Sequence, residues 1–548
     1  MVVRDELLLV LDLTSTLLRA GVGVHDLIRG PLIELPTRVG RMSGKPGTRV
    51  EDYLVGAQLA AAEAVTAAGG LRDFDIIDPV RVDPRTGAFE VTDWNALEAV
   101  FRYAMHTSLQ LQRPPLAHPT ILSIPPNVSP STTDQLHRLL FERLLVPQLL
   151  VSTRPFFAAG AAGILSGIVV DIGYRGEGTE ISAVHENQVL AAPSGFRLPD
   201  IDEGVCDDYC AYKLLEADPS IEQQLLDAKR VAATDGSAET SLAPGELVNC
   251  MRQIVQDLKL SHAINFESPL LGTAISQLLQ LGLQQAAGEG EEGEEGTLDV
   301  AKAIVEGKVD DIVRGGKGVN EDEEDGRVVR VANPCAPAPA AAAAVAGEAA
   351  PASPHATIRI GPARHRYLEP LFFPSVLSAL APSSPSSSSS GALAASLFGD
   401  AHARFAKPGG MPDAGLHEAI GVVLSGVTEE EIRNAVSEAV VVVSSGRLAN
   451  NRALGSALIP LLSPFRSDPS AGVYDPDGAA TPSTRTTRFA RAPHYFSSFK
   501  ERTGDWAVYL GACIMGKLLI GDTQSKLFMS KQDYAAHGPA HYRLLEAV

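Results

Sequence analysis

Two aspartates stand at the ends of apolar runs, and each precedes a short turn of small or polar residues. Asp12 follows the run Leu7–Leu11 and precedes Leu-Thr-Ser-Thr. Asp171 follows Gly167–Val170 and precedes a turn that carries Gly173. A carboxylate at a strand end can hold a metal ion through water, and glycine lets backbone N–H groups approach a phosphate closely. This pattern could therefore serve phosphate and metal binding, although on the pattern alone a plain β-hairpin is the favoured interpretation.

Both aspartates belong to strand–turn–strand units, Leu7–Gly23 and Gly167–Val184, which lie about 160 residues apart. Internal similarity of this kind indicates duplication. We therefore expect a duplicated fold whose two turns face one cleft.

The composition restricts the kind of protein. The chain has 548 residues, 45% of them hydrophobic, and a net charge of −20, with acidic runs at Glu289–Glu295 and Glu321–Asp325. This length is sufficient for more than one core. The acidic balance argues against a chain that wraps nucleic acid by itself, because phosphate binding needs clustered Lys and Arg.

Cysteine usage and hydropathy favour a soluble, intracellular protein. The five cysteines are scattered, which fits a reducing compartment. Cys206 and Cys210 could share a metal ion, but no second pair or histidine cluster accompanies them, so we predict ordinary thiols. We find no signal peptide and no apolar run long enough for a bilayer, and we expect no membrane partner.

Strand and helix patterns alternate along the chain, which predicts a mixed α/β architecture. We expect a flexible loop over Pro31–Val50 and a mostly helical region over 200–285. The remaining predicted elements are helices over Asp52–Ala67, Thr92–Leu111, Asp134–Leu145, Thr428–Ala439 and much of Trp506–Pro539, and strands over Thr120–Ile124 and Val440–Val443.

Three low-complexity segments interrupt this pattern. Residues 288–354 are acidic and glycine-rich and then Ala/Pro-rich, and they are expected to be largely disordered, because such segments bury little apolar surface. The Pro/Ser-rich stretch 381–391 and the Asp/Pro/Gly/Thr-rich stretch 467–487 are interpreted as solvated linkers.

Taken in order, the segments resemble the actin and actin-related protein family over nearly the whole chain outside the insertions. The motifs that carry the resemblance are the two hairpins (Leu9–Gly21 and Val170–Ile181), Asp52–Leu59, Val91–Leu111, Ile121–Gln148, Ile360–Ser375, Ser444-Ser445-Gly446, and Ser530–Tyr534 followed by Gly538-Pro539. Tyr495-Phe496, Tyr509–Ala512 and Phe528–Lys531 look closest to a fungal, nuclear branch of the family.

The resemblance implies the duplicated actin, Hsp70 and sugar-kinase fold, with four subdomains around a central cleft and disordered insertions. The implied divisions are subdomain 1 at 1–30, 75–160 and 495–548, subdomain 2 at 31–74, subdomain 3 at 161–197 and 357–494, and subdomain 4 at 198–356.

The resemblance also places a degenerate ATP cleft on Asp12, Ser15, Arg19, Asp171, Gly173, Ser445 and Gly446. Thr14 and Thr16 replace two phosphate-binding glycines of the family, and their β-carbons should obstruct close backbone approach. Tyr174 replaces the family's second aspartate, which weakens a magnesium site. Arg154 falls where the family has its water-orienting glutamine, and an arginine cannot polarise water in that way. We predict no catalytic residue, no metal and no ATP hydrolysis, and leave open ATP binding without turnover.

Two functions follow from the resemblance. In the first, the chain is a nuclear, non-catalytic subunit of a SWI/SNF- or RSC-type chromatin remodeller. It would bind the helical pre-ATPase segment of the motor subunit beside a second nuclear actin-related protein, and nucleosome contact would be indirect. The expected binding groove comprises Phe157, Leu510, Ile514, Met515 and Leu518, although this stripe could equally be core.

In the second, the chain is a nucleotide-binding actin-like ATPase or a cytoskeletal or chaperone-type protein of the same fold. That function needs intact phosphate turns.

Overall fold

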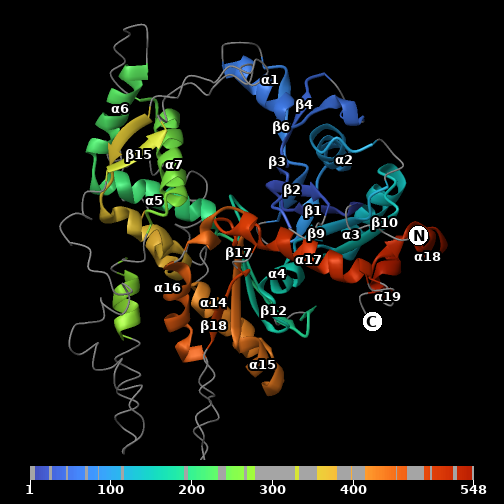
Figure 1. Ribbon diagram of the computed structural model, residues 1–548. Helices are drawn as coiled ribbons and strands as arrows, with labels where there is room; N and C mark the ends of the chain where they lie inside the picture. Colours follow the sequence, from blue (N-terminus) through green and yellow to red (C-terminus); the bar gives the residue numbers. More distant parts are fainter. Residues whose placement is uncertain are drawn as a thin grey trace, which may run out of the picture.

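The computed structural model describes residues 7–23, 28–44, 47, 49–67, 72–83, 86–112, 117–190, 195–232, 242–264, 268, 270–277, 328–332, 355–378, 380, 397, 414–451, 453–465, 487–493, 496–521 and 527–545. Within them, two large sheets form the centre of the molecule (Figure 1).

The two central sheets have the same strand order. The first runs β19-β10-β9-β1-β2-β3, and the second, read in the matching direction, runs β18-β17-β11-β12-β13, with β14 also paired to β12. The strands of the first sheet are β1 (Leu9–Leu13), β2 (Leu17–Val22), β3 (Ile33–Pro36), β9 (Thr120–Ile124), β10 (Gln148–Thr153) and β19 (Met529–Ser530). Those of the second are β11 (Gly167–Ile172), β12 (Thr179–His185), β13 (Gln188–Val189), β14 (Gly195–Leu198), β17 (Ala439–Ser444) and β18 (Arg488–Ala490).

Each sheet contains one hairpin and a parallel strand beside it. β1 pairs antiparallel with β2 and parallel with β9, and β11 pairs antiparallel with β12 and parallel with β17. These central strands are continuous apolar runs with every residue buried in β1, β9, β11 and β17, as strands covered on both faces require. The predicted duplication is therefore present in the topology.

Register brings the two aspartates to equivalent places. Asp12 lies opposite Arg19 on β2 and beside Ser123 on β9. Asp171 lies opposite Glu180 on β12 and beside Val443 on β17. Both stand near the carboxyl ends of parallel strands, the edge at which ligands bind in open α/β sheets.

The helices α4 (Arg154–Ala162) and α17 (Ala507–Gly521) pack against one another between the sheets (Figure 1). Their buried side chains form one core with Val10 of β1, Val169 of β11 and Val441 of β17. Pro155 stands in the first turn of α4, where a missing N–H costs nothing, and Gly163 ends the helix in the left-handed conformation. This core joins the two halves of the molecule.

Two smaller units lie beyond the sheets, on opposite sides of the upper part of Figure 1. One contains α1 (Ala57–Ala67) and the sheet of β4 (Val39–Met42), β5 (Tyr53–Leu54) and β6 (Phe74–Ile77). The other contains α5 (Glu203–Ala217), α6 (Ser220–Ala232), α7 (Pro244–Leu260) and the hairpin of β15 (Val328–Ala332) and β16 (His355–Arg359).

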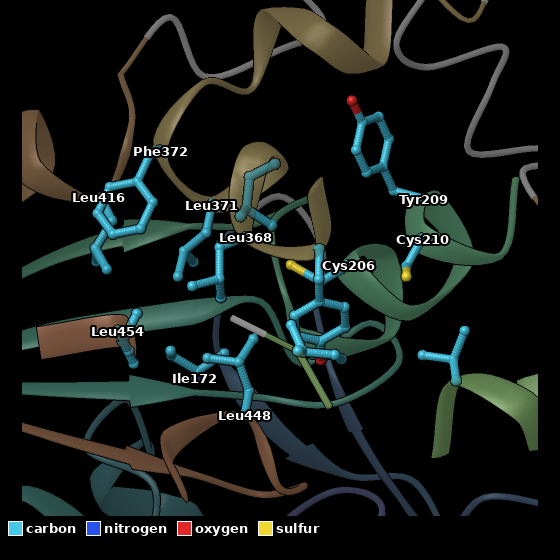
Figure 2. Close-up of a cluster of buried hydrophobic side chains, with 14 of the residues drawn as sticks. Ile172, Cys206, Tyr209, Cys210, Leu368, Leu371, Phe372, Leu416, Leu448 and Leu454 are labelled. Atoms are coloured by element: carbon cyan, nitrogen blue, oxygen red, sulfur yellow. The ribbon is translucent and has the colours of Figure 1, made fainter. Parts of the chain in front are cut away.

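The helix α5 packs its buried Cys206, Tyr209 and Cys210 against a large apolar cluster that also contains Leu368 and Phe372 (Figure 2). The remaining named elements are β7 (Val80–Val82), β8 (Phe89–Val91), α2 (Trp94–Arg102), α3 (Pro130–Arg138), α11 (Glu369–Phe372), α12 (Ser375–Ser378), α14 (Leu416–Gly426), α15 (Glu430–Ser437), α16 (Ala453–Leu461), α18 (Lys531–His537) and α19 (Tyr542–Leu545).

Several predicted elements need correction. The region Pro31–Val50 is not a loop throughout, because it contains β3 and β4, strands of four residues that are too short for a clear alternating pattern. Residues 328–332 form β15 inside the segment that we expected to be disordered. The rest of 288–354, the stretch 381–391 and residues 467–486 lie outside the described residues.

The predicted helix Asp52–Ala67 begins only at Ala57, because Tyr53–Leu54 form the strand β5. Two other helix predictions are correct in kind but too regular. The predicted helix Thr92–Leu111 is α2, capped by Asp93, followed by a π-helical segment over Tyr103–Ser108. Likewise, α3 is capped by Ser129 and continues in a π-helical segment over Leu139–Arg143. Caps are local signals and were therefore visible in the sequence, whereas the hydrogen-bond shift inside a helix was not.

We expect Gly511→Ala to destabilise the protein by about 1–3 kcal/mol in denaturant unfolding. An added β-carbon at Gly511 would overlap the Phe157 carbonyl oxygen of α4, which is backbone and cannot move aside alone. The matched control is Gly245→Ala in the first turn of α7, where no atom lies within 4 Å of the added carbon. The control should be neutral or slightly stabilising, and equal stability of the two variants would contradict this packing.

Candidate functional site

The turns of the two central hairpins meet, and we call this region the hairpin junction: Asp12, Ser15, Thr16, Arg19, Arg154, Asp171 and Glu177. The Glu177 carboxylate connects the turns. Its Oε1 accepts hydrogen bonds from the Ser15 hydroxyl (2.8 Å), the Thr16 N–H (3.1 Å) and the Thr16 hydroxyl (3.1 Å). Its Oε2 accepts from the Tyr174 N–H at 2.9 Å. One carboxylate therefore binds donors of both turns.

Two glycines allow the second turn to place the Glu177 carboxylate against the donors of the first turn. A β-carbon at Gly173 would collide with Glu177 and with the Gly178 carbonyl. Gly178 has φ +71°, a conformation that other residues rarely adopt. The sequence predicted Gly173 as a site residue but not Glu177. The signal that could have identified it is an acidic residue between the two glycines of a tight turn.

The Arg154 guanidinium lies between the two strand-end aspartates. Arg154 is the first residue of α4 and is buried, with 2% of its side chain exposed. Its Nη1 donates to Asp12 Oδ1 at 2.5 Å, and its Nε and Nη2 donate to Asp171 Oδ2 and Oδ1 at 2.5 and 3.2 Å. Burial acts to lower the pKa of Arg154, but Asp12 and Asp171 outweigh it and raise the pKa above its ordinary value. The guanidinium therefore remains charged.

Arg19 links the first hairpin to the turn after β17. Its Nη2 donates to the Ser445 carbonyl at 2.5 Å, and its Nη1 lies 3.5 Å from Asp12 Oδ2. Its Nε donates to Glu34 Oε1 at 3.0 Å. Because Arg19 lies in the first sheet and Ser445 directly follows a strand of the second, this side chain also connects the two halves.

Glu34 on β3 collects donors from the C-terminal part of the chain. It accepts from Arg502 Nη1 and Nη2 at 2.8 and 2.9 Å and from the Trp506 indole at 3.0 Å. Burial acts to raise the pKa of Glu34, but the hydrogen bonds from Arg502 and Trp506 and the charges of Arg19 and Arg502 together lower it to about 2. The carboxylate is charged across the physiological range.

The turn Ser445-Gly446 is held by Glu203 of α5. The Glu203 carboxylate accepts from the N–H groups of Arg447 and Leu448 at 2.7 and 2.9 Å, and Lys259 donates to it at 2.7 Å. A β-carbon at Gly446 would collide with this carboxylate. Gly446 is therefore required by a contact within the protein.

The expected partner-binding residues divide between core and surface. Phe157 and Leu510 are completely buried, whereas Leu518 is 63% exposed and Ile514 and Met515 are half-buried. The stripe 510, 514, 518 thus runs from the core to the surface along α17. Phe157 and Leu510 cannot line an open groove in this structure, because they pack between the sheets.

Cys206 and Cys210 are buried thiols one turn apart on α5. Among the described residues, no group of three His, Cys, Asp or Glu side chains is arranged to hold a metal ion. The same part of the chain contains no helix that is both long and apolar enough to cross a membrane.

Comparison with known proteins agrees with the architecture. Residues 4–198 match the family model described as Actin, and this range includes both central hairpins and α4. The chain thus contains an actin family domain, and its mixed α/β fold is actin-like, which confirms the fold class predicted from the sequence.

Similar proteins are themselves actin-related or actin-like. Actin-related protein 4 of Arabidopsis thaliana is 32% identical over 100 residues, which cover 18% of this chain and 22% of that protein. The SWI/SNF and RSC complexes subunit arp9 of Schizosaccharomyces pombe is 24% identical over 217 residues, covering 34% and 41%. Actin-like protein 9 of Homo sapiens is 28% identical over 144 residues, covering 26% and 31%. The matched stretches span less than half of each relative, and the predicted resemblance to actin-related proteins is confirmed.

The resemblance implies ATP and a divalent cation, but the residues of the hairpin junction, as arranged, do not fit them. A phosphate at the first turn would be repelled by the Glu177 carboxylate, which already accepts a hydrogen bond from the Thr16 N–H. A cation between Asp12 and Asp171 would meet the Arg154 guanidinium. Like charges at such distances repel strongly when buried.

We expect Arg154→Ala to lower the free energy of unfolding by about 3–5 kcal/mol, because the buried carboxylates of Asp12 and Asp171 would lose their shared counter-charge. The matched control is Arg38→Ala. Arg38 pairs with Glu63 at 3.0 Å, and its side chain is 48% exposed. Exposed pairs contribute about 1 kcal/mol or less. Similar losses for both variants in urea unfolding would show that the buried pairing is unimportant.

The Glu34 contacts predict an acid-dependent loss of stability. Because folding lowers the pKa of Glu34 from 4.5 to about 2, its contribution is complete above pH 4.5 and is lost as the pH falls towards 2. Glu34→Gln should therefore reduce stability at pH 7 and flatten the decline between pH 4.5 and 2. Unfolding curves across this range measure the slope, and an unchanged slope in the variant would contradict the assignment.

Proposed function

We propose that this protein is a non-hydrolysing, structural subunit of a SWI/SNF- or RSC-type chromatin-remodelling complex in the nucleus. It binds the helical pre-ATPase segment of the motor subunit, beside a second nuclear actin-related protein, and contacts nucleosomes only indirectly. The division into four subdomains given by the sequence is part of this proposal.

The observation that carries the proposal is the Arg154 guanidinium between Asp12 and Asp171. Hydrolysis of ATP by this fold needs the phosphates and their cation at the hairpin turns. Here the Glu177 carboxylate already accepts hydrogen bonds from donors of those turns. Arg154 lies between the two aspartates, where the cation would bind. A fold that has lost this chemistry remains useful as a rigid surface for partners.

The similarity to the S. pombe SWI/SNF and RSC complexes subunit supports the choice of complex. The acidic chain fits a subunit that does not itself hold DNA, since DNA binding needs clustered basic residues.

The outer face of α17 supports a helical partner. Ile514 and Leu518 are one turn apart and, with Met515, present an apolar surface on the second half of this helix. Leu518 is 63% exposed and extends this apolar surface to the solvent. An amphipathic helix of the partner would cover this face with its own apolar side.

The alternative, a nucleotide-driven actin-like ATPase, requires free donors at the first turn. The Thr16 N–H and both neighbouring hydroxyls, those of Ser15 and Thr16, donate to Glu177. The structural role is therefore the better supported of the two.

The proposal is tested by purifying the tagged full-length protein from nuclear extract and identifying the proteins that co-elute. The wild type should retain a SWI/SNF- or RSC-type motor subunit. The double variant Ile514→Asp with Leu518→Asp should lose it by at least about tenfold, because a charge would be buried at the contact. Val65→Asp is the matched control, as Val65 is 61% exposed on the distant helix α1.

Two results would contradict these assignments separately. Absence of every remodeller subunit from the wild-type eluate would refute the proposed function. Equal recovery with the folded double variant would refute the binding face alone. Circular dichroism establishes that each variant is folded.

A further inference from the structure

We propose that Glu177 and Arg154 form a latch that holds the two halves of the protein together in the absence of nucleotide. Glu177 acts as an internal anion at the first turn, and Arg154 acts as an internal cation between the two aspartates. The inference concerns the chain alone and does not depend on any partner.

Glu177 has the environment of a bound anion. Four donors converge on its carboxylate, two of them backbone N–H groups, those of Thr16 and Tyr174. Backbone N–H groups in turns are the donors that bind phosphates in many proteins. Glu177 is itself 8% exposed, so its carboxylate is largely withdrawn from water. An external phosphate could reach these donors only by displacing it.

Arg154 has the environment of a bound cation. Asp12 and Asp171 are 1% and 9% exposed, and two buried carboxylates that face one site repel each other unless a cation lies between them. The three nitrogens of Arg154 supply that charge with directional hydrogen bonds. Because Arg154 is part of the chain, dilution or a chelator cannot remove this cation as it could remove a bound metal ion.

The latch joins the halves because its groups come from different sheets. Ser15, Thr16 and Asp12 belong to the first hairpin, whereas Glu177 and Asp171 belong to the second. Arg19 adds a third connection through the Ser445 carbonyl. A ligand shifts a conformational equilibrium only by its differential affinity for the two states. Because Glu177 and Arg154 already supply both charges, we expect Mg-ATP to have no higher affinity for the joined state than for the separated state.

The experiment compares wild type, Glu177→Ala, Glu177→Gln and the control Glu501→Ala, an exposed glutamate outside the junction. Hydrogen exchange is followed in peptides that cover Thr14–Leu17, and thermal unfolding is measured with and without millimolar Mg-ATP. In wild type and control, the Thr16 amide should be protected and Mg-ATP should leave the melting temperature unchanged. Glu177→Ala should exchange at Thr16 at least about tenfold faster and melt lower.

Glu177→Gln keeps one acceptor oxygen but loses the charge, so its exchange rate should lie between those of wild type and Glu177→Ala. This variant keeps the test decisive if the alanine variant does not fold. A rise of several degrees in the wild-type melting temperature with Mg-ATP would overturn the latch, because it requires bound nucleotide. Unchanged exchange at Thr16 in either variant would overturn it as well. Neither result bears on the α17 face. A rise with Mg-ATP would also count against the Arg154 argument for the proposed function, whereas the co-elution of remodeller subunits tests that function separately.

Discussion

The guanidinium of Arg154 lies between two carboxylates that the chain buries near the ends of its central strands. Asp12 and Asp171 are placed there by register, since each lies near the end of a strand that pairs with a hairpin partner and a parallel neighbour. The low dielectric of the interior makes their repulsion costly and their pairing with a single cation favourable. The positive charge at the start of α4 therefore stabilises the approach of the two sheets, together with Arg19, which lies 3.5 Å from Asp12 and donates to the Ser445 carbonyl.

The same constraint explains the other polar contacts around the junction. Once Arg154 is fixed, the first turn still presents the N–H of Thr16 and two hydroxyls, which need acceptors when water is excluded. Glu177 supplies the acceptor from the opposite turn. Glu203 does the same for the turn after β17. An actin-like fold can thus keep its two-part architecture through its own side chains, which is consistent with a structural role.

Much of the fold was predictable because its signals are local. The continuous apolar strands, the duplicated hairpins and the helix caps at Asp93 and Ser129 depend on residues close together in sequence. The prediction failed for β3, β4 and β15, because these strands lie in Gly/Pro-rich or low-complexity segments and are ordered by pairing with β2, β6 and β16. It was too regular for α2 and α3, where packing decides how the helix continues.

The sequence by itself determined that two acidic strand ends would be related by duplication, which follows from residue type and spacing. Its resemblance to the actin family implied further that Thr14 and Thr16 stand in place of phosphate-binding glycines and that Arg154 stands where the family has a glutamine. Only the tertiary structure decided that Glu177 and Glu203 accept hydrogen bonds from the N–H groups of turns in other parts of the chain. It alone separated the buried Phe157 and Leu510 from the exposed Leu518. The physical reason is that charge pairing and burial depend on which distant segments meet, and no local pattern encodes that meeting.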